Sequence, residues 1–141
     1  MIRWSAYMMI AIGILHMLVL GYDALPVIRG WAQFDLWTMT HTTTPPADRP
    51  FEIVVSTDSF WATIGGFAIP FIVFGALLLW LDRRGYPLPS FVGWCLGGWA
   101  LVNSLIMQPS GFPLLIIVAA LLVIGARRQR RAGQEPRRQS T

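Results

Sequence analysis

The sequence predicts an all-α membrane protein, a bundle of four transmembrane helices with an extended external loop between the first and second helices. Three observations predict this fold class. Hydrophobic residues make up 55% of the 141 residues and charged residues only 13%, whereas soluble domains carry roughly 25% charged residues. Uncharged apolar stretches of spanning length recur along the chain. The eleven basic residues, all arginines, are concentrated in a few places.

The uncharged apolar stretches give the expected membrane spans, which are residues 4–22, 59–81, 90–107 and 112–126. No charge occurs from Gly85 to Ala126. At about 1.5 Å per residue this run is too long for one crossing and fits a hairpin of two. The turn residues Pro109 to Gly111 divide the hairpin. In the second span, Gly65, Gly66 and Pro70 predict a kink, where a carbonyl near residue 66 needs a new partner.

The arginines predict the orientation of the chain. Nine of them lie at Arg3, at Arg83 and Arg84, and in the tail, while only Arg29 and Arg49 lie elsewhere. Arginine is enriched in cytoplasmic loops, and four crossings place all nine on the cytoplasmic side. Both termini are therefore expected in the cytoplasm. This distribution, rather than nucleic-acid binding, explains the sequence pI of about 10.2.

Two segments are expected outside the bundle. The external loop, residues 23–58, begins with an amphipathic stretch at the membrane surface, where Val27, Trp31 and Phe34 have helical spacing. It ends with a short extended piece at residues 51–55, and its role is interfacial packing or a lid, with ligand contact as the alternative. The basic tail, residues 127–141, lacks apolar residues to bury and is expected to be disordered.

His16 is the main candidate for a functional residue, because an ionisable side chain inside an apolar span is costly and needs a partner. Asn103 in the third span is expected at a similar depth, and Asp23 follows His16 on the same helix face. His16, Asn103 and Asp23 are therefore the candidate ligand-binding residues. A plain hydrogen bond from His16 to a neighbouring helix is the favoured alternative. Metal, haem or proton-transfer chemistry is a further one.

The sequence supports no catalytic residue, metal site or cofactor. A zinc centre needs at least three ligands with suitable spacing, and a bis-histidine haem needs a second intramembrane histidine. All seven acidic residues lie outside the expected spans, and nucleophile and phosphate-loop motifs are absent from the sequence. Cys95 alone cannot form an intramolecular disulfide. We therefore favour a protein that is not an enzyme.

A stripe of small residues lies on one face of the third span: Gly93, Gly97, Ala100 and Ser104. The spacing of its two glycines lets two helices approach closely. Packing against another span of the same chain is the favoured role of this stripe. Homodimerisation through the third span is the alternative.

Several short motifs resemble those of a known protein family. They are Gly13-x-x-His16, Ser59-Phe60-Trp61, Gly75 to Leu79, Arg84 to Pro89, Val92-Gly93-Trp94 and Met107 to Phe112. In these the chain resembles a family of small bacterial four-helix integral membrane proteins of unknown function. The resemblance implies the topology given above and a bacterial inner-membrane location. It implies no activity, cofactor or catalytic residue.

The function that the sequence favours is an integral membrane protein of unknown biochemical activity. It would bind a lipid-like or small amphipathic ligand, or assist a membrane partner, with membrane lipid as its expected partner and no nucleic acid. An oligomeric transporter or efflux component is the first alternative. A membrane oxidoreductase or quinone-interacting accessory is the second.

Overall fold

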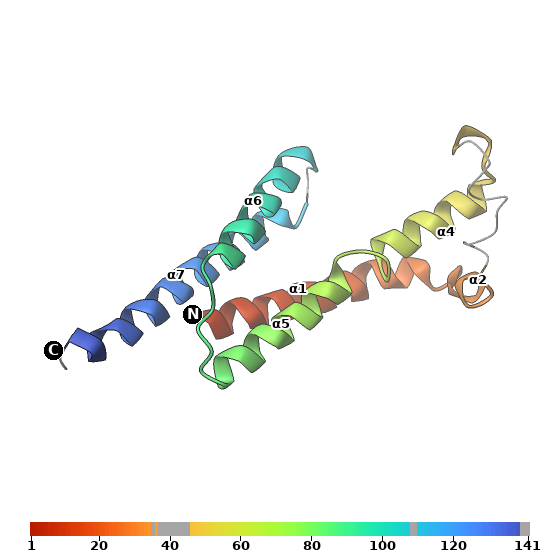
Figure 1. Cartoon of the computed structure of the whole chain (residues 1–141). Helices are drawn as coiled ribbons and strands as arrows, with labels where there is room; N and C mark the ends of the chain where they lie inside the picture. Colours follow the sequence, from red (N-terminus) through yellow and green to blue (C-terminus); the bar gives the residue numbers. More distant parts are fainter. Residues whose placement is uncertain (35, 37–45, 108–109, 139–141) are drawn as a thin grey trace. The chain divides into compact units, whose positions relative to one another are not determined.

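The computed structural model describes residues 1–34, 36, 46–107 and 110–138 (Figure 1). The described residues form six α helices and one short 3-10 turn, without a strand, which confirms the all-helical expectation. The helices are α1 (Ile2–Ala24), α2 (Ile28–Ala32), α4 (Phe51–Ala62), α5 (Ala68–Arg83), α6 (Phe91–Ile106) and α7 (Phe112–Arg138), and the 3-10 turn is η2 (Pro46–Asp48).

Two of the described helices are long and apolar enough to cross a membrane: α1, with 23 residues, and the part of α7 from Phe112 to Ala132, with 21. Helices α5 and α6 have 16 residues each. A helix of that length is about 24 Å long, whereas a bilayer hydrocarbon core is about 30 Å thick. Helix length alone therefore does not support four transmembrane helices.

The chain divides into two compact units. The first contains Met1–Ala11 and Ile72–Thr141, and the second contains Ile12–Phe71. Helices α1 and α5 contribute residues to both units.

In the first unit, α6 and α7 pack side by side (Figure 1). The buried core of α7 includes Leu115, Val118 and Leu122, which are almost completely shielded from solvent. The start of α1 also packs in this unit, because a Cβ atom at Gly125 would lie 2.7 Å from the side chain of Ile2. A Cβ atom at Gly75 would lie 2.8 Å from the carbonyl oxygen of Ala6. Glycine thus allows close approach of helices at both positions.

Helix α5 ends in a Schellman motif centred on Gly85. The amide of Tyr86 donates to the carbonyl of Leu81 and the amide of Gly85 donates to the carbonyl of Asp82. Gly85 has a φ of 73°, which is the left-handed conformation that this motif requires and that glycine adopts without a Cβ clash. The motif ends the helix sharply and leads the chain into the connection before α6.

In the second unit, the expected second span is broken. Helix α4 ends at Ala62 and α5 begins at Ala68. The amide of Gly66 donates to the carbonyl of Thr63 rather than to Ala62, and Thr63 Oγ1 donates to the carbonyl of Ser59 at 2.6 Å. Pro70 lies in the first turn of α5, where its missing amide proton costs no helical hydrogen bond. The kink expected in residues 59–81 is thus an interruption of the helix.

One expectation about regular structure is wrong. Residues 51–55 were expected to form a short extended piece, but they open α4. Pro50 precedes the first helical residue with a φ of −55°, and Glu52 in the first turn interacts favourably with the helix dipole.

The basic tail begins as a continuation of the last helix, because α7 extends beyond the expected span through the arginines to Arg138. Residues 139–141 lie outside the described residues, and the disorder expected of this tail, which has no apolar residues to bury, stays a prediction. Extending an existing helix needs no new nucleus, and arginine, alanine and glutamine are good helix formers.

Candidate ligand-binding groove

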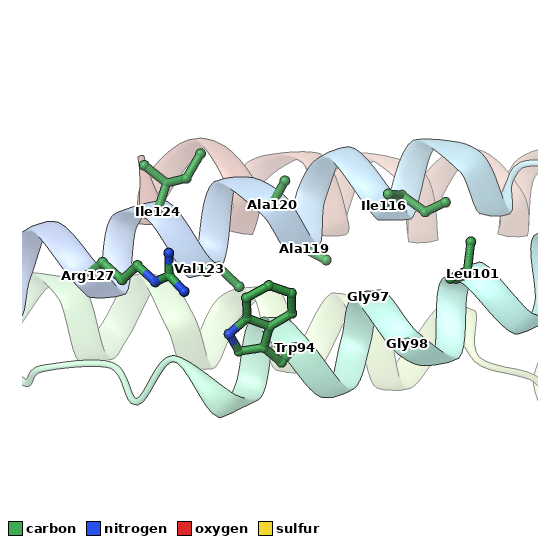
Figure 2. A pocket seen from close by; sticks show the side chains of 11 residues that line it. Trp94, Gly97, Gly98, Leu101, Ile116, Ala119, Ala120, Val123, Ile124 and Arg127 are labelled. Carbon is green, nitrogen blue, oxygen red and sulfur yellow. The ribbon is translucent and has the colours of Figure 1, made fainter.

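A groove of about 560 Å³ runs between α6 and α7 within the first unit (Figure 2). Its α6 side consists of Gly93, Trp94, Gly97, Gly98 and Leu101. Gly97 and Gly98 leave the groove face of α6 without side chains between Trp94 and Leu101. A Cβ atom at Gly98 would meet no atom within 4 Å, so the surface at this position is open space.

The α7 side of the groove is apolar except at one end. It consists of Ile116, Ala119, Ala120, Val123, Ile124 and Arg127. Ala119 and Ala120 have short side chains, so they take up little of the groove. Arg127 is the only charged residue among those that line the groove, so the site combines an apolar channel with a single positive charge.

Arg127 lies beside an aromatic ring at its end of the groove. The guanidinium carbon of Arg127 is 5.7 Å from the ring centroid of Trp94, within the range of a cation–π contact (Figure 2). Both side chains are exposed. An indole ring with a guanidinium beside it presents an apolar surface and hydrogen-bond donors together, which suits the junction between the tail and the head group of an amphipathic molecule.

The small-residue stripe of α6 faces α7. A Cβ atom at Gly93 would lie 2.9 Å from the backbone nitrogen of Val123 and 3.0 Å from the carbonyl oxygen of Ala119. A Cβ atom at Gly97 would lie 3.3 Å from the Cβ of Ala119. Ala100 and Ser104 are buried, and Ser104 Oγ donates to the carbonyl of Ala100 at 2.7 Å. The contacts of the stripe are therefore within the chain.

His16 contacts the helix interruption in the second unit. Its Nε2 atom is 2.9 Å from the carbonyl oxygen of Ala62, and its ring centroid is 4.6 Å from that of Phe67. A carbonyl oxygen can only accept, so Nε2 must carry the proton in this arrangement. Ala62 is the last residue of α4, and the amide that would pair with its carbonyl in a continuous helix belongs to Gly66, which pairs with Thr63. His16 thus supplies the donor that the interruption removes.

The other two candidate ligand-binding residues have different surroundings. Asp23 is exposed near the end of α1, in the second unit. Asn103 belongs to the first unit, is half-buried, and donates from Nδ2 to the carbonyl of Trp99 in its own helix at 2.8 Å. A shared ligand site of His16, Asn103 and Asp23 stays a prediction.

The external segment folds locally within the second unit. Trp31 of α2 donates from Nε1 to Ser56 Oγ at 3.0 Å, and its ring lies edge-on to Phe60 with 5.6 Å between the centroids. The expected amphipathic stretch is therefore in contact with α4. His41 and the threonine-rich part of the loop lie outside the described residues.

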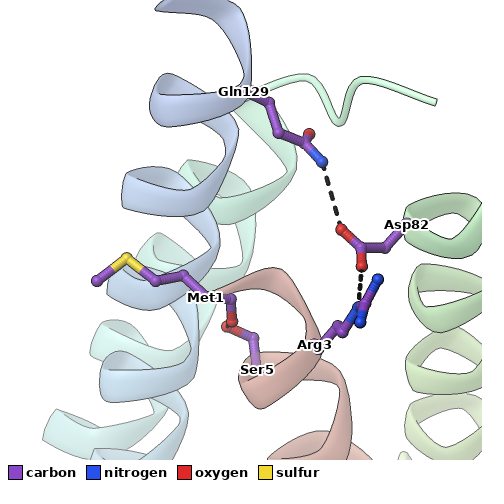
Figure 3. Close-up of polar contacts among 5 residues, drawn as sticks. All are labelled: Met1, Arg3, Ser5, Asp82 and Gln129. Carbon is purple, nitrogen blue, oxygen red and sulfur yellow. Dashed lines mark hydrogen bonds and ion pairs between the residues drawn. The ribbon is translucent and has the colours of Figure 1, made fainter. Parts of the chain in front are cut away.

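A polar network that the sequence did not reveal joins four segments of the first unit (Figure 3). Arg3 Nε donates to one carboxylate oxygen of Asp82 at 2.6 Å, and Gln129 Nε2 lies 3.4 Å from the other. Gln129 Oε1 accepts from the amide of Leu88 at 3.0 Å. The only hint in the sequence is that Asp82, an acidic residue, stands directly before two arginines. Sequence patterns of this kind do not reveal partners 79 or 47 residues away.

Most of the residues that line the groove are likewise not among the candidates that the sequence indicates. Of its lining residues, the sequence indicates Gly93 and Gly97 as packing residues and Arg127 only as one of the arginines that predict the orientation. Among the described residues, no three His, Cys, Asp or Glu side chains are grouped closely enough to hold a metal ion. The groove with its terminal arginine is therefore the candidate site with the clearest chemistry.

Comparison with protein families gives one match, over residues 1–129, to a family described as a family of unknown function (DUF6463). No curated protein and no solved structure matches the chain. The chain belongs to the matched family, and the match covers every residue that lines the groove. An uncharacterised family was implied by the resemblance in the sequence, while the bacterial and membrane character stays a prediction.

Proposed function

We propose that this member of a family of unknown function is a multi-pass integral membrane protein that binds an amphipathic, lipid-like molecule in the groove between α6 and α7. The observation that carries the proposal is the combination of an apolar groove with one cation at its end. No catalytic or redox step is part of it. The role is binding.

The exposed apolar surface of the helices supports a membrane location. Leu18 in α1 is 69% exposed and Ile106 at the end of α6 is 75% exposed, and many other large apolar side chains are exposed as well. Only 22% of the most apolar part of α1 is buried. A core helix of a soluble protein would be mostly buried, and soluble monomers rarely expose large contiguous apolar patches. Lipid is the solvent that suits such a surface.

Four crossings are part of the proposal, with residues 59–81 and 90–107 crossing together with α1 and α7. Helices α5 and α6 are short for this, but each is continued by further uncharged residues, namely 63–67 before α5 and Ser90 and Met107 around α6. Helices shorter than the hydrocarbon core are accommodated by local thinning of the bilayer at a modest cost. The arginine distribution favours this arrangement, with both termini in the cytoplasm and Arg127 at the cytoplasmic end of the groove.

The experiment that tests ligand binding uses two glycines that face open space. Gly98→Leu places a side chain in the groove, and Gly21→Leu adds the same side chain to α1 at a residue that does not line the groove. Neither added Cβ meets an atom within 4 Å, so both variants should fold. Native mass spectrometry of the protein released from detergent should show tightly bound lipid in the parent and in Gly21→Leu, and little in Gly98→Leu. Equal retention in all three proteins would overturn the proposal.

A further inference from the structure

We infer that the molecule bound in the groove is an acidic phospholipid of the membrane, with an acyl chain along the apolar channel and its phosphate at Arg127. This inference rests on the proposed function and deepens it. Three observations carry it: the apolar channel, the position of Arg127 at its end, and the charges around that position.

The channel suits an acyl chain. Its α6 side extends from Gly93 to Leu101, a rise of about 12 Å along the helix. Gly97 and Gly98 leave the groove face free of side chains between Trp94 and Leu101, and Ile116 and Ile124 flank it from α7. An acyl chain that moves from the bilayer into this channel exchanges one apolar environment for another. The transfer itself therefore contributes little binding free energy. Selectivity among lipids must therefore come from the head group.

Arg127 provides the head-group contact. Among the described residues, no carboxylate forms an ion pair with Arg127. A guanidinium binds two oxygens of a phosphate through parallel hydrogen bonds, which a lysine ammonium does not reproduce. Figure 2 shows the indole nitrogen of Trp94 at the same end of the groove as the Arg127 guanidinium. An indole N–H is a donor only, so both polar side chains that line this end of the groove are donors.

The charge near this end favours a head group with a net negative charge. Arg131 lies one helical turn beyond Arg127 on the same side of α7 and is exposed. A choline or ethanolamine head group would bring its own cation close to these two arginines, and like charges repel. A phosphatidylglycerol head group carries the phosphate charge alone. Basic residues at the cytoplasmic end of a membrane helix attract acidic lipids for the same reason.

The test measures lipid selectivity in the full-length protein. Detergent-purified protein is incubated with equal amounts of phosphatidylglycerol and phosphatidylcholine with identical chains, and the bound lipids are counted by native mass spectrometry. We expect the parent to bind phosphatidylglycerol several-fold more than phosphatidylcholine. Arg127→Gln should bring the ratio close to one, and Arg127→Lys should give an intermediate ratio.

Arg128→Gln is the matched control. It also removes one positive charge, at the next residue along the helix, but the Arg128 side chain does not line the groove. It should keep the ratio of the parent. Equal losses in Arg127→Gln and Arg128→Gln would overturn the inference, because a diffuse surface charge would then explain the selectivity. So would a parent ratio near one. If in that case Gly98→Leu still abolishes lipid binding, the groove function stands and only the head-group assignment fails.

Discussion

His16 Nε2 lies 2.9 Å from the carbonyl oxygen of Ala62, at the point where the helix between residues 51 and 83 is interrupted. Two features of the sequence that looked unrelated are thereby connected. The interruption leaves a carbonyl without its helical donor, and an unsatisfied carbonyl in an apolar surrounding is expensive. The histidine in an otherwise apolar helix supplies that donor. This contact explains His16 without a ligand.

Substitution of His16 separates the structural role from a ligand-binding role. His16→Leu removes the donor and should lower the free energy of unfolding by about 1 kcal/mol, while His16→Gln keeps an amide donor and should lose less. Thermal melting in detergent measures the difference. Bound lipid should be retained in both variants, because the groove is formed by α6 and α7. Loss of lipid in both variants with unchanged melting would instead make His16 part of a ligand site.

Close packing between α6 and α7 predicts opposite effects of alanine at two glycines. At Gly93 a new Cβ would meet backbone atoms of Val123 and Ala119 at 2.9 and 3.0 Å, and backbone cannot easily move away. We expect Gly93→Ala to be destabilised by about 1 to 3 kcal/mol. At Gly98 a new Cβ would lie in open space, so Gly98→Ala should raise the free energy of unfolding by up to about 1 kcal/mol through helix propensity.

The comparison of these two variants isolates packing, because both replace a helical glycine with alanine and so share the propensity gain. Chemical or thermal unfolding of the two proteins in the same detergent gives the values. Equal stability of Gly93→Ala and Gly98→Ala would mean that the two helices do not approach closely at Gly93.

The helical fold could be predicted from the sequence because apolar composition and uncharged runs depend only on local residues. Gly65, Gly66 and Pro70 also predict the kink in residues 59–81, but they do not predict which carbonyl His16 contacts. The missing amide of Pro70 points to a carbonyl near residue 66, and the structure shows in addition that the carbonyl of Ala62 has the His16 side chain as its partner. Which carbonyl loses its donor depends on the backbone path through Thr63 to Phe67, and composition does not specify that path.

The groove and the polar network could not be predicted for a different reason. Both depend on the register between segments that are distant in the sequence. Arg127 meets Trp94 across 33 positions of the chain only because α6 and α7 are antiparallel neighbours with a particular register. Asp82 meets Arg3 and Gln129 in the same way. A single sequence indicates which residues are polar, but it does not indicate which of them will be adjacent.

Substitution of Asp82 tests that network. Asp82 is only 16% exposed and accepts from both Arg3 and Gln129, whereas Arg3 is 64% exposed. Asp82→Ala should therefore destabilise the protein by about 1 to 2 kcal/mol, because the Gln129 amide loses its acceptor as well. Arg3→Gln should have a smaller effect, since exposed ion pairs are weak. Melting temperatures of the two variants in one detergent compare them, and a larger loss for Arg3→Gln would contradict the network.

Topology is tested best by a reporter placed in the connection between α5 and α6. With four crossings, a reporter fused after Arg84 lies in the cytoplasm. If only the two long helices α1 and α7 cross, everything between them lies on the outer side and the same reporter lies outside.

A fusion after Thr141 reports cytoplasm in both cases, so it does not separate the two topologies, but an outer-side signal there would exclude both. A fusion after Pro46 should report the outer side, and a cytoplasmic signal at that position would exclude a crossing by α1 from a cytoplasmic N-terminus. We expect cytoplasm after Arg84 and Thr141 and the outer side after Pro46, because this pattern alone places all nine clustered arginines on the side where positive charge is retained.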